Sequence, residues 1–473
     1  MAGWISKFLY HVDIHTKPKA ILKGGKNHVK KSQLLLAIVL AVLLCFAGLS
    51  AALAAGLNEK GGLEAANEND PIKAAATKIL EVPVGTDVPS AVFQFAFTPI
   101  KVDDEPYDSQ MPNMPSLDDV TVNFSDSATA ITPTGDVERY YMESGNIFSG
   151  VTKSTFPHDG IYVYEFTEIE NTNTDIDANI HKHTTLTYSG AKYTLAIYVA
   201  YTEDGSGTYI YGLGTYLPTE EAADITSEEG KTDPTPGGND EGYFYSQMIF
   251  INQYVKTNGA DAPDDPEPAS ESTLSVSKTV TGSSGNQDEY FKFSIELTVP
   301  SLVKDIPNFY RAYVVKDGEV VTSTSNADSS LIDADDTENA YSYIEISTSG
   351  PTAFQLQHGQ SLVFVNTPVG TGYDVSESAS DHIPSVIVTT GGSAASKVEG
   401  KVATDLKVTG QRVGESNNTN KINSADFTNF RNLITPVGLS MNDLPFVVLT
   451  GLALTALIVF IAVKSHKRKA TDA

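Results

Sequence analysis

The chain has one cysteine, Cys45, among 473 residues, and this cysteine lies in a hydrophobic run near the start of the sequence. No disulfide can therefore form within the chain. Proteins outside the cell commonly use disulfides to resist unfolding and proteolysis. If this chain is exported, as both of its end segments predict, it needs a different means of resisting force and proteases.

Basic residues are also scarce, because 32 Lys and Arg residues stand against 59 Asp and Glu residues, a formal net charge of −27. Residues 1–54 and 464–473 hold 11 of the 32 basic residues but only two of the 59 acidic ones, so the part between them is more acidic than the whole. Such a surface repels nucleic acid and anionic lipid, which argues against both as partners of this part. The charge instead favours a soluble region outside a cell.

The usual signatures of turnover enzymes are absent from the sequence, which has no Gly-rich phosphate loop, nucleophile elbow or zinc-protease motif. His181 and His183 share one side of a predicted strand, but no further ligand follows at a recognisable spacing. The acidic run 333–338 lacks the central glycine of a calcium loop. We therefore expect no metal, no cofactor and no enzyme that turns over.

Helical periodicity is nearly absent, and alternating strand patterns take its place. Residues 93–97, 193–201 and 290–297 alternate in polarity as half-buried strands do. Asp317-Gly318 and His358-Gly359 predict hairpin turns. Many short strands separated by turns indicate an all-β fold, here two tandem antiparallel immunoglobulin-like β-sandwich domains.

The N-terminal segment, residues 1–54, has the pattern of a signal peptide. Lys30-Lys31 precede an apolar run that begins at Leu34, and Ala52-Leu53-Ala54 forms an A-x-A cleavage triplet. An uncleaved membrane anchor is the alternative, because the apolar run is long. Either interpretation predicts export.

The C-terminal segment predicts an anchor. Residues 444–463 form an apolar span long enough to cross a bilayer as a transmembrane helix, and a basic tail follows. Just before it, Thr435-Pro436-Val437-Gly438 resembles the sorting motif of Gram-positive surface proteins, in the pilin variant E-V-P-T-G. Pro436 and Gly438 align with that motif, whereas Val437 replaces the threonine that a sortase attacks. The resemblance implies anchoring at the cell surface, in the membrane or in the cell wall.

Composition divides the chain between these end segments. A polar spacer, 55–71, leads into a first β-rich region, 72–256. Residues 257–271 combine prolines with acidic residues and predict an extended linker. A second β-rich region, 272–433, ends where the sorting-like segment, the predicted helix and the basic tail, 434–473, begin.

Both β-rich regions contain a lysine, a glutamate and an asparagine in the same order. The two sets are Lys78, Glu168 and Asn252, then Lys278, Glu377 and Asn429. Each lysine lies on the first predicted strand of its region, and each asparagine lies on the last, two places after a phenylalanine. Because strand side chains alternate, each asparagine shares a face with that phenylalanine. If that face is the core, each lysine meets its asparagine among aromatic rings.

Two nearby lysines compete for this role. Lys73 is an odd number of residues from Lys78, so the two point to opposite faces of a strand. Lys292 lies between Phe291 and Phe293 and is expected to point outward when those rings point inward. Lys78 and Lys278 are therefore the preferred candidates.

These three residue types can form an amide bond between side chains. Burial lowers the pKa of a lysine, so that its neutral amine can attack, and raises the pKa of a glutamate, so that it stays protonated. A protonated glutamate polarises the asparagine amide and carries protons while ammonia leaves. The predicted product is an isopeptide bond, formed once per site, with Glu168 and Glu377 as catalysts.

Several phrases of the second region resemble the streptococcal pilin isopeptide linkage domain of Gram-positive pilus shaft proteins. They are SKTVTG at 277–282, FKF at 291–293, HGQS at 358–361 and GYDVSE at 372–377. In that family a first-strand lysine bonds to a last-strand asparagine with a glutamate as catalyst. The resemblance extends to the first region and implies cross-links between Lys78 and Asn252 and between Lys278 and Asn429.

The family resemblance also implies partners, namely a sortase and other pilin subunits, with Lys231 as a candidate for the lysine that accepts the next subunit. The sequence thus predicts a structural cell-surface protein, a pilin-like subunit or stalk. The alternative is a monomeric, membrane-anchored adhesin that binds a host or bacterial ligand. A surface hydrolase needs paired acids in a cleft, and no motif in the sequence supplies them.

Overall fold

The structure is a computed structural model. It describes residues 67–103, 105–108, 114–170, 184–217, 230–238, 244–256, 272–321, 331–332, 341–415, 423–432 and 444–469. The predicted signal peptide, the linker 257–271 and the sorting-like residues Thr435, Pro436, Val437 and Gly438 lie outside the described residues. So do His181, His183 and the acidic run 333–338, and the interpretations of all these segments stay predictions.

The first half of the structure is a β-sandwich of short strands. In chain order these are β1 (Thr77–Pro83), β2 (Ala91–Val102), β3 (Glu105–Pro106), β4 (Val120–Phe124), β5 (Thr129–Thr134), β6 (Val137–Glu143), β7 (Gly160–Ile169), β8 (Thr184–Thr187), β9 (Lys192–Tyr201), β10 (Thr208–Tyr216), β11 (Lys231–Thr232) and β12 (Ile249–Lys256). One sheet has the order β5-β6-β1-β12-β8, and the other has the order β11-β10-β9-β7-β2-β3 with β4 paired to β2. The two sheets enclose one hydrophobic core.

The second half repeats this plan. Its strands are β13 (Leu274–Thr281), β14 (Phe291–Thr298), β15 (Phe309–Lys316), β16 (Glu319–Val320), β17 (Ile344–Ser347), β18 (Thr352–Leu356), β19 (Gln360–Phe364), β20 (Gly372–Glu377), β21 (Ile383–Thr390), β22 (Ser393–Ala394), β23 (Val398–Glu399), β24 (Leu406–Arg412) and β25 (Ser424–Phe430). The larger sheet has the order β16-β15-β19-β13-β25-β21-β22, with β17 paired to β15 and β23 to β21. The smaller sheet has the order β18-β14-β20-β24. The expected all-β fold of two tandem sandwiches is confirmed.

One strand pair in each sandwich departs from the expected antiparallel arrangement. The first strand runs parallel to the last, as β1 does to β12 and β13 to β25, whereas the other strand pairs among the described residues are antiparallel. Thr77 at the start of β1 lies opposite Ile249 at the start of β12. The chain therefore enters each sandwich at one end of this pair and leaves at the other.

The two predicted hairpin turns have different outcomes. Asp317 and Gly318 both have positive φ, 53° and 84°, the backbone that a tight two-residue turn requires, and they join the paired strands β15 and β16. The hairpin predicted at His358-Gly359 is wrong, because β18 pairs with β14 in one sheet and β19 pairs with β13 and β15 in the other. Turn residues in a sequence do not distinguish a hairpin from a crossing between sheets.

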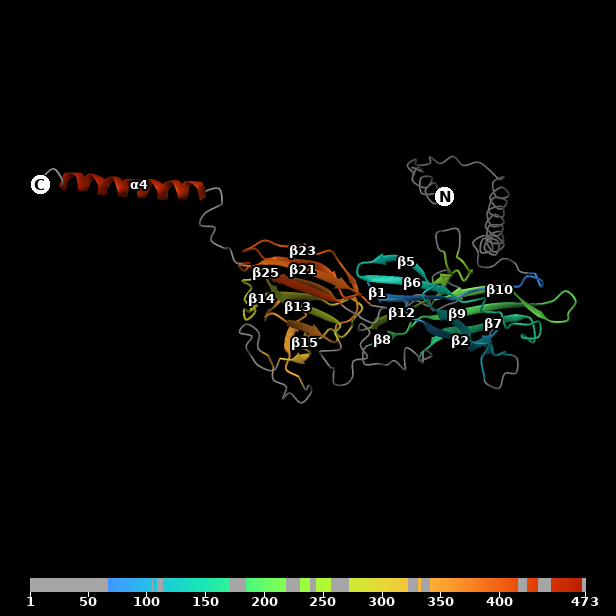
Figure 1. Ribbon diagram of the computed structural model, residues 1–473. Coiled ribbons are helices and arrows are strands. Elements are labelled where there is room, and N and C mark those ends of the chain that lie inside the picture. Colours follow the sequence, from blue (N-terminus) through green and yellow to red (C-terminus); the bar gives the residue numbers. More distant parts are fainter. Residues whose placement is uncertain are drawn as a thin grey trace, which may run out of the picture.

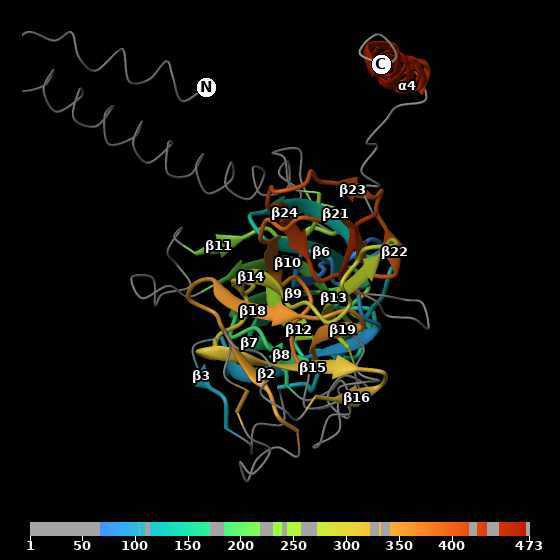
Figure 2. The ribbon, with the colours of Figure 1, turned by 60° about the vertical axis from the view of Figure 1, so that its left-hand side comes forward.

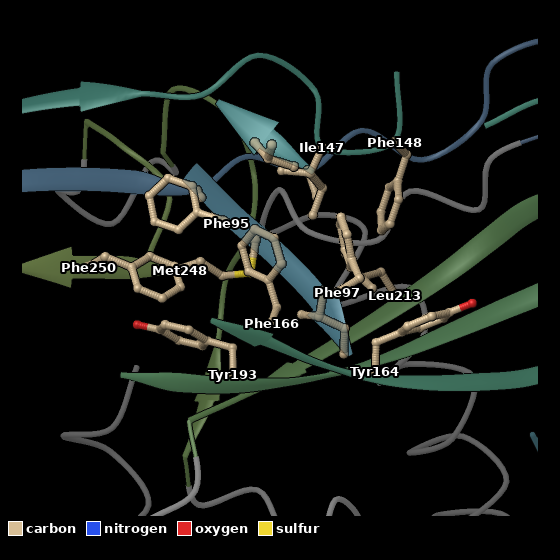
Figure 3. Packing of buried hydrophobic residues seen from close by; sticks show 14 of the residues in the cluster. Phe95, Phe97, Ile147, Phe148, Tyr164, Phe166, Tyr193, Leu213, Met248 and Phe250 are labelled. Atoms are coloured by element: carbon tan, nitrogen blue, oxygen red, sulfur yellow. The ribbon is translucent and has the colours of Figure 1, made fainter. Parts of the chain in front are cut away.

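Aromatic side chains fill the core of the first sandwich (Figure 3). The Phe95 and Phe250 rings lie 4.7 Å apart between centroids, and Tyr193 meets Phe250 edge-on at 5.2 Å. Phe166 stacks on Phe95 at 5.8 Å. Buried aromatic pairs of this kind each contribute about 0.5–1.5 kcal/mol beyond the area they bury. They also exclude water from the polar groups beside Phe250.

The sandwiches lie end to end in Figure 1, and in Figure 2 the second lies in front of the first. Glu415 joins them: its carboxylate pairs with Lys256 at the end of β12 and accepts a hydrogen bond from the Asp87 N–H at 2.8 Å. Its own N–H donates to the Gly85 carbonyl at 2.8 Å. The Val369 N–H donates to the Lys256 carbonyl at 2.8 Å. These contacts therefore lie at the end of β12 and in the turn that follows β1.

The described residues include one helix that meets the length and composition of a membrane span. Helix α4 (Leu444–Lys469) contains the apolar stretch Pro445–Ser465, which is 21 residues long and has a mean hydropathy of 2.8. None of this stretch is buried against the rest of the protein. A helix of this length covers the hydrocarbon core of a bilayer, which is about 30 Å thick. This helix agrees with the predicted C-terminal span.

Candidate cross-linking sites

The first sandwich brings Lys78, Glu168 and Asn252 together in its core. Lys78 on β1 and Asn252 on β12 come from neighbouring strands of one sheet, and Glu168 on β7 comes from the facing sheet. Both Lys78 and Asn252 have no exposed surface, and the Glu168 side chain is also fully covered. The cluster therefore joins three strands and both sheets.

The carboxylate of Glu168 holds the other two side chains. The Lys78 Nζ donates to Glu168 Oε1 at 2.7 Å and to Oε2 at 2.8 Å. The Asn252 Nδ2 donates to the same Oε1 at 2.8 Å. Because both nitrogens bind one oxygen, the amine and the amide lie side by side.

The second sandwich repeats this arrangement with Lys278 on β13, Glu377 on β20 and Asn429 on β25. The Lys278 Nζ lies 2.5 Å from Glu377 Oε1, and the Asn429 Nδ2 donates to that same oxygen at 2.6 Å. Lys278 and Asn429 have no exposed surface. The two sites thus share their donors, their acceptor and their strand positions.

Phenylalanine rings cover each amine. The Lys78 Nζ lies 4.5 Å from the Phe93 ring centroid, and the Lys278 Nζ lies 4.2 Å from that of Phe291 and 5.6 Å from that of Phe293. A ring face stabilises a cation, but it replaces water that stabilises the cation more. The environment therefore disfavours the charged amine.

Burial lowers the pKa of both lysines from 10.5 to about 8, because the charged amine loses its hydration. The charge of Glu168 acts in the opposite direction on Lys78, and Glu377 does so on Lys278, but neither cancels the loss of hydration. Each amine therefore loses its proton far more readily than a lysine in water. A deprotonated amine has the lone pair that a nucleophile needs.

This lowered pKa predicts how stability depends on pH in a variant that cannot cross-link. Asn252→Ala keeps the Lys78 amine and its carboxylate. Since Lys78 has a pKa of about 8 when folded and 10.5 when unfolded, the unfolded chain binds more protons between these values. The free energy of unfolding should therefore rise from pH 8 to pH 10.5, by up to about 3 kcal/mol. Urea unfolding at a series of pH values measures this rise.

The matched control for this pH series removes the titrating pair. In Lys78→Met/Glu168→Gln/Asn252→Ala the buried site holds no ionisable group, while the other lysines and tyrosines of the chain still titrate. The difference between the two variants isolates Lys78. Equal slopes in both variants would contradict the lowered pKa.

The turn at His358-Gly359 holds the backbone on both sides of the second lysine. The Gly359 N–H donates to the Lys278 carbonyl at 2.8 Å, and His358 Nδ1 accepts from the Val280 N–H at 3.0 Å. Gly359 has a φ of 79°, a conformation that favours glycine. The HGQS phrase thus fixes the position of β13 as well as connecting two sheets.

The competing lysines lie elsewhere. Lys73 precedes β1 and is exposed, with its amine 3.1 Å from Asp70 Oδ1. Lys292 is exposed on β14, between the buried Phe291 and Phe293, as alternation predicted. Lys231 lies on β11 opposite Tyr216, at the edge of the sheet that contains Glu168. Lys73, Lys231 and Lys292 therefore lie outside the two buried clusters to which Lys78 and Lys278 belong.

Sequence reasoning missed one group at the first site, the backbone N–H of Ser189. It donates to Asn252 Oδ1 at 2.7 Å and to Glu168 Oε2 at 3.3 Å. Ser189 lies in the loop between β8 and β9. No sequence pattern marks it, because every residue type except proline carries a backbone N–H.

Comparisons with known proteins give a partial match. A family model described as a domain of unknown function (DUF7601) matches residues 272–429, which include Lys278, Glu377 and Asn429. No curated protein matches the chain. The family match thus covers the second sandwich and assigns it no function.

Several solved structures are similar to this chain. The major pilin from Streptococcus pyogenes has 18% identity over 76% of this chain and 99% of its own, with a TM-score of 0.29. The major pilin protein T3.2 from Streptococcus pyogenes has 16% identity over 76% and 98%, with a TM-score of 0.26. The pilus-presented adhesin Cpa has 14% identity over 52% of this chain and 37% of its own, with a TM-score of 0.19. At these TM-scores the similarities support no conclusion on their own.

Proposed function

We propose that this chain is a structural cell-surface protein, a pilin-like subunit or stalk, whose two sandwiches are each closed by a self-formed isopeptide bond. The bonds join Lys78 to Asn252 and Lys278 to Asn429. The single observation that carries the proposal is the pair of buried clusters in which one glutamate oxygen binds both a lysine amine and an asparagine amide. A buried ion pair between lysine and glutamate does not require an asparagine. Here an asparagine amide is hydrogen-bonded to the glutamate at both sites.

The reaction follows from the contacts in each cluster. The carboxylate of Glu168 takes a proton from the Lys78 amine, and the neutral nitrogen attacks the Asn252 Cγ. A bond forms between Nζ and Cγ, and the bond between Cγ and Nδ2 breaks. Glu168 passes the proton to Nδ2, with which it already shares a hydrogen bond, and ammonia leaves. The carboxylate then takes the second proton that Nζ loses as it becomes an amide nitrogen. Glu377 acts in the same way between Lys278 and Asn429.

The folded core supplies the rate of this reaction. Holding two reactants side by side replaces a collision in solution by an intramolecular step, which is worth about 7–11 kcal/mol in favourable cases. The lowered lysine pKa adds a larger fraction of neutral amine. Each site reacts once, because its asparagine is consumed, so the chain is its own substrate and not a turnover enzyme.

The proposed role at the surface rests on the anchor and on the strand arrangement. Helix α4 has the length and composition of a membrane span, and it follows the second sandwich in the chain. Cross-links between first and last strands suit a shaft that is held at one end and pulled at the other. We propose cell-surface anchoring through the C-terminal segment, with a sortase and other pilin subunits as partners in assembly. We also propose that the two sandwich domains comprise residues 72–256 and 272–433.

Intact mass tests the bonds. Residues 55–433 should weigh less than the calculated mass by two ammonia molecules, and Glu168→Ala and Glu377→Ala should each restore one. Glu165→Ala is the matched control, because Glu165 lies on the same strand as Glu168 with its side chain partly exposed. A parent protein at its full calculated mass would remove the basis of the proposal.

The second candidate function is a monomeric membrane-anchored adhesin, which the apolar helix α4 favours because such a helix retains a protein in the membrane without a sortase. The size distribution of material released from the cell wall separates the two. A ladder of sizes supports assembly into fibres, and a single size supports the adhesin. Both candidates keep the two isopeptide bonds.

A further inference from the structure

The two candidate sites differ in what surrounds the asparagine oxygen. At the first site, Asn252 Oδ1 accepts a hydrogen bond of 2.7 Å from the Ser189 N–H. At the second site, Asn429 Oδ1 and Glu377 Oε2 are buried and have no hydrogen-bond partner among the described residues. The oxygen of the amide under attack thus accepts a hydrogen bond at the first site and has no described donor at the second.

We propose that the Ser189 backbone N–H is an oxyanion donor for closure of the first site, and that the first isopeptide bond therefore forms faster than the second. This inference rests on the proposed function. It assigns a catalytic contact to the backbone of a loop residue that lies outside the Lys–Glu–Asn set.

The chemistry places new negative charge on the atom that Ser189 contacts. When Lys78 Nζ attacks Cγ, the carbonyl becomes tetrahedral and Oδ1 takes up the electron pair. A backbone N–H already aimed at this oxygen stabilises the charge without reorganising, and removing one such donor slows comparable reactions about 10²–10³-fold. As the carbonyl reforms, Cγ–Nδ2 breaks, the proton carried by Glu168 leaves with ammonia, and the carboxylate then takes the second proton from Nζ. Nothing outside the site is consumed.

The same hydrogen bond also orients the amide. With Oδ1 turned toward the Ser189 N–H, Nδ2 faces the Glu168 carboxylate at 2.8 Å. The leaving nitrogen therefore lies next to the group that protonates it. At the second site Asn429 Nδ2 also meets its glutamate, but no described donor fixes the oxygen.

The serine side chain has a separate role. Its Oγ accepts a hydrogen bond of 3.3 Å from the Ala191 N–H within the loop. Ser189→Ala therefore keeps the donor to Asn252 and removes only this loop contact. Ser189→Pro removes the donor, because proline has no backbone N–H. The two variants separate the backbone contact from the side chain.

The test follows both bonds in the same full-length chain. The chain is made as a short labelled pulse in a cell-free system with detergent, sampled over time and digested. Mass spectrometry then measures the linked peptide pairs around Lys78–Asn252 and Lys278–Asn429. Ser189→Pro should slow the first bond about 10²-fold and leave the second unchanged. Ser189→Ala should leave both rates within about twofold of the wild type.

A folding control keeps this test decisive. In the Lys78→Met background, where the first bond cannot form, adding Ser189→Pro should leave the melting of the first sandwich close to that of Lys78→Met alone. If Ser189→Pro instead lowers that melting temperature, the inference is tested on the wild-type chain alone. There the first bond must form at least about tenfold faster than the second. Equal rates or the reverse order would overturn the inference.

The outcomes also distinguish this inference from the proposed function. Linked peptides at both sites, with the first formed as fast in Ser189→Pro as in the wild type, overturn the role of Ser189 and leave the bonds intact. The absence of linked peptides at both sites in the wild type overturns the proposed function itself.

Discussion

Pulled between points on either side of the first sandwich, the wild-type chain should not lengthen by unfolding of that sandwich, whereas Asn252→Ala should lengthen by on the order of 600 Å. The reason is the parallel pairing of β1 with β12, which puts the entry and exit of the chain at opposite ends. Force that enters at Thr77 reaches Lys78 at once, crosses the proposed bond and leaves through β12. The chain between Lys78 and Asn252 carries none of it.

Single-molecule force spectroscopy measures this difference as the presence or absence of one long step. Asn123→Ala is the matched control, because Asn123 is an exposed asparagine on β4 and the substitution is the same. It should behave as the wild type does. A long step in the wild type would show that the load does not pass through a covalent bond at this site.

Loss of one bond should also lower stability, and only in its own sandwich. A bond that closes a loop of more than a hundred residues stabilises by about 5 kcal/mol in the chain-entropy model. For a sandwich of this size, that corresponds to a fall of roughly 10–20 °C in melting temperature. Asn252→Ala should therefore lower the melting of the first sandwich, and Asn429→Ala that of the second.

Calorimetry resolves the two melting transitions in one scan. Each variant serves as the reference for the other, since each leaves one bond in place, and Asn123→Ala should shift neither transition by more than the equivalent of about 0.5 kcal/mol. If Asn252→Ala melts with the wild type, the first bond either does not form or contributes nothing to stability. Intact mass distinguishes these two explanations.

Sequence alone indicated on which face of its strand a side chain lies, because a period of two is enough to assign faces. Phe250 and Asn252 were expected on one face, and both are buried. Lys292 was expected to point outward, and it does. Strand order along the chain and the position of each lysine on a first strand then limited the partners. Local patterns sufficed wherever one strand decides the outcome.

The remainder depends on how strands are arranged in space. Glu168 reaches Lys78 from the facing sheet, and neither residue's neighbours in the sequence specify that pairing. The His358-Gly359 turn has the composition of a hairpin, yet it connects opposite sheets. The Ser189 donor is a backbone group and has no signature in the sequence. Contacts made by backbone atoms of loops become visible only in the folded chain.

The placement of each lysine on a first strand and each asparagine on a last strand also sets a time order. Neither bond can form until the last strand of its sandwich has left the ribosome and docked beside the first. A chain exported as it is made, or held unfolded before export, therefore crosses the membrane as an unbranched thread. Among the described residues, β25 is the last strand before helix α4. Its docking therefore requires that the whole of the second sandwich has been synthesised.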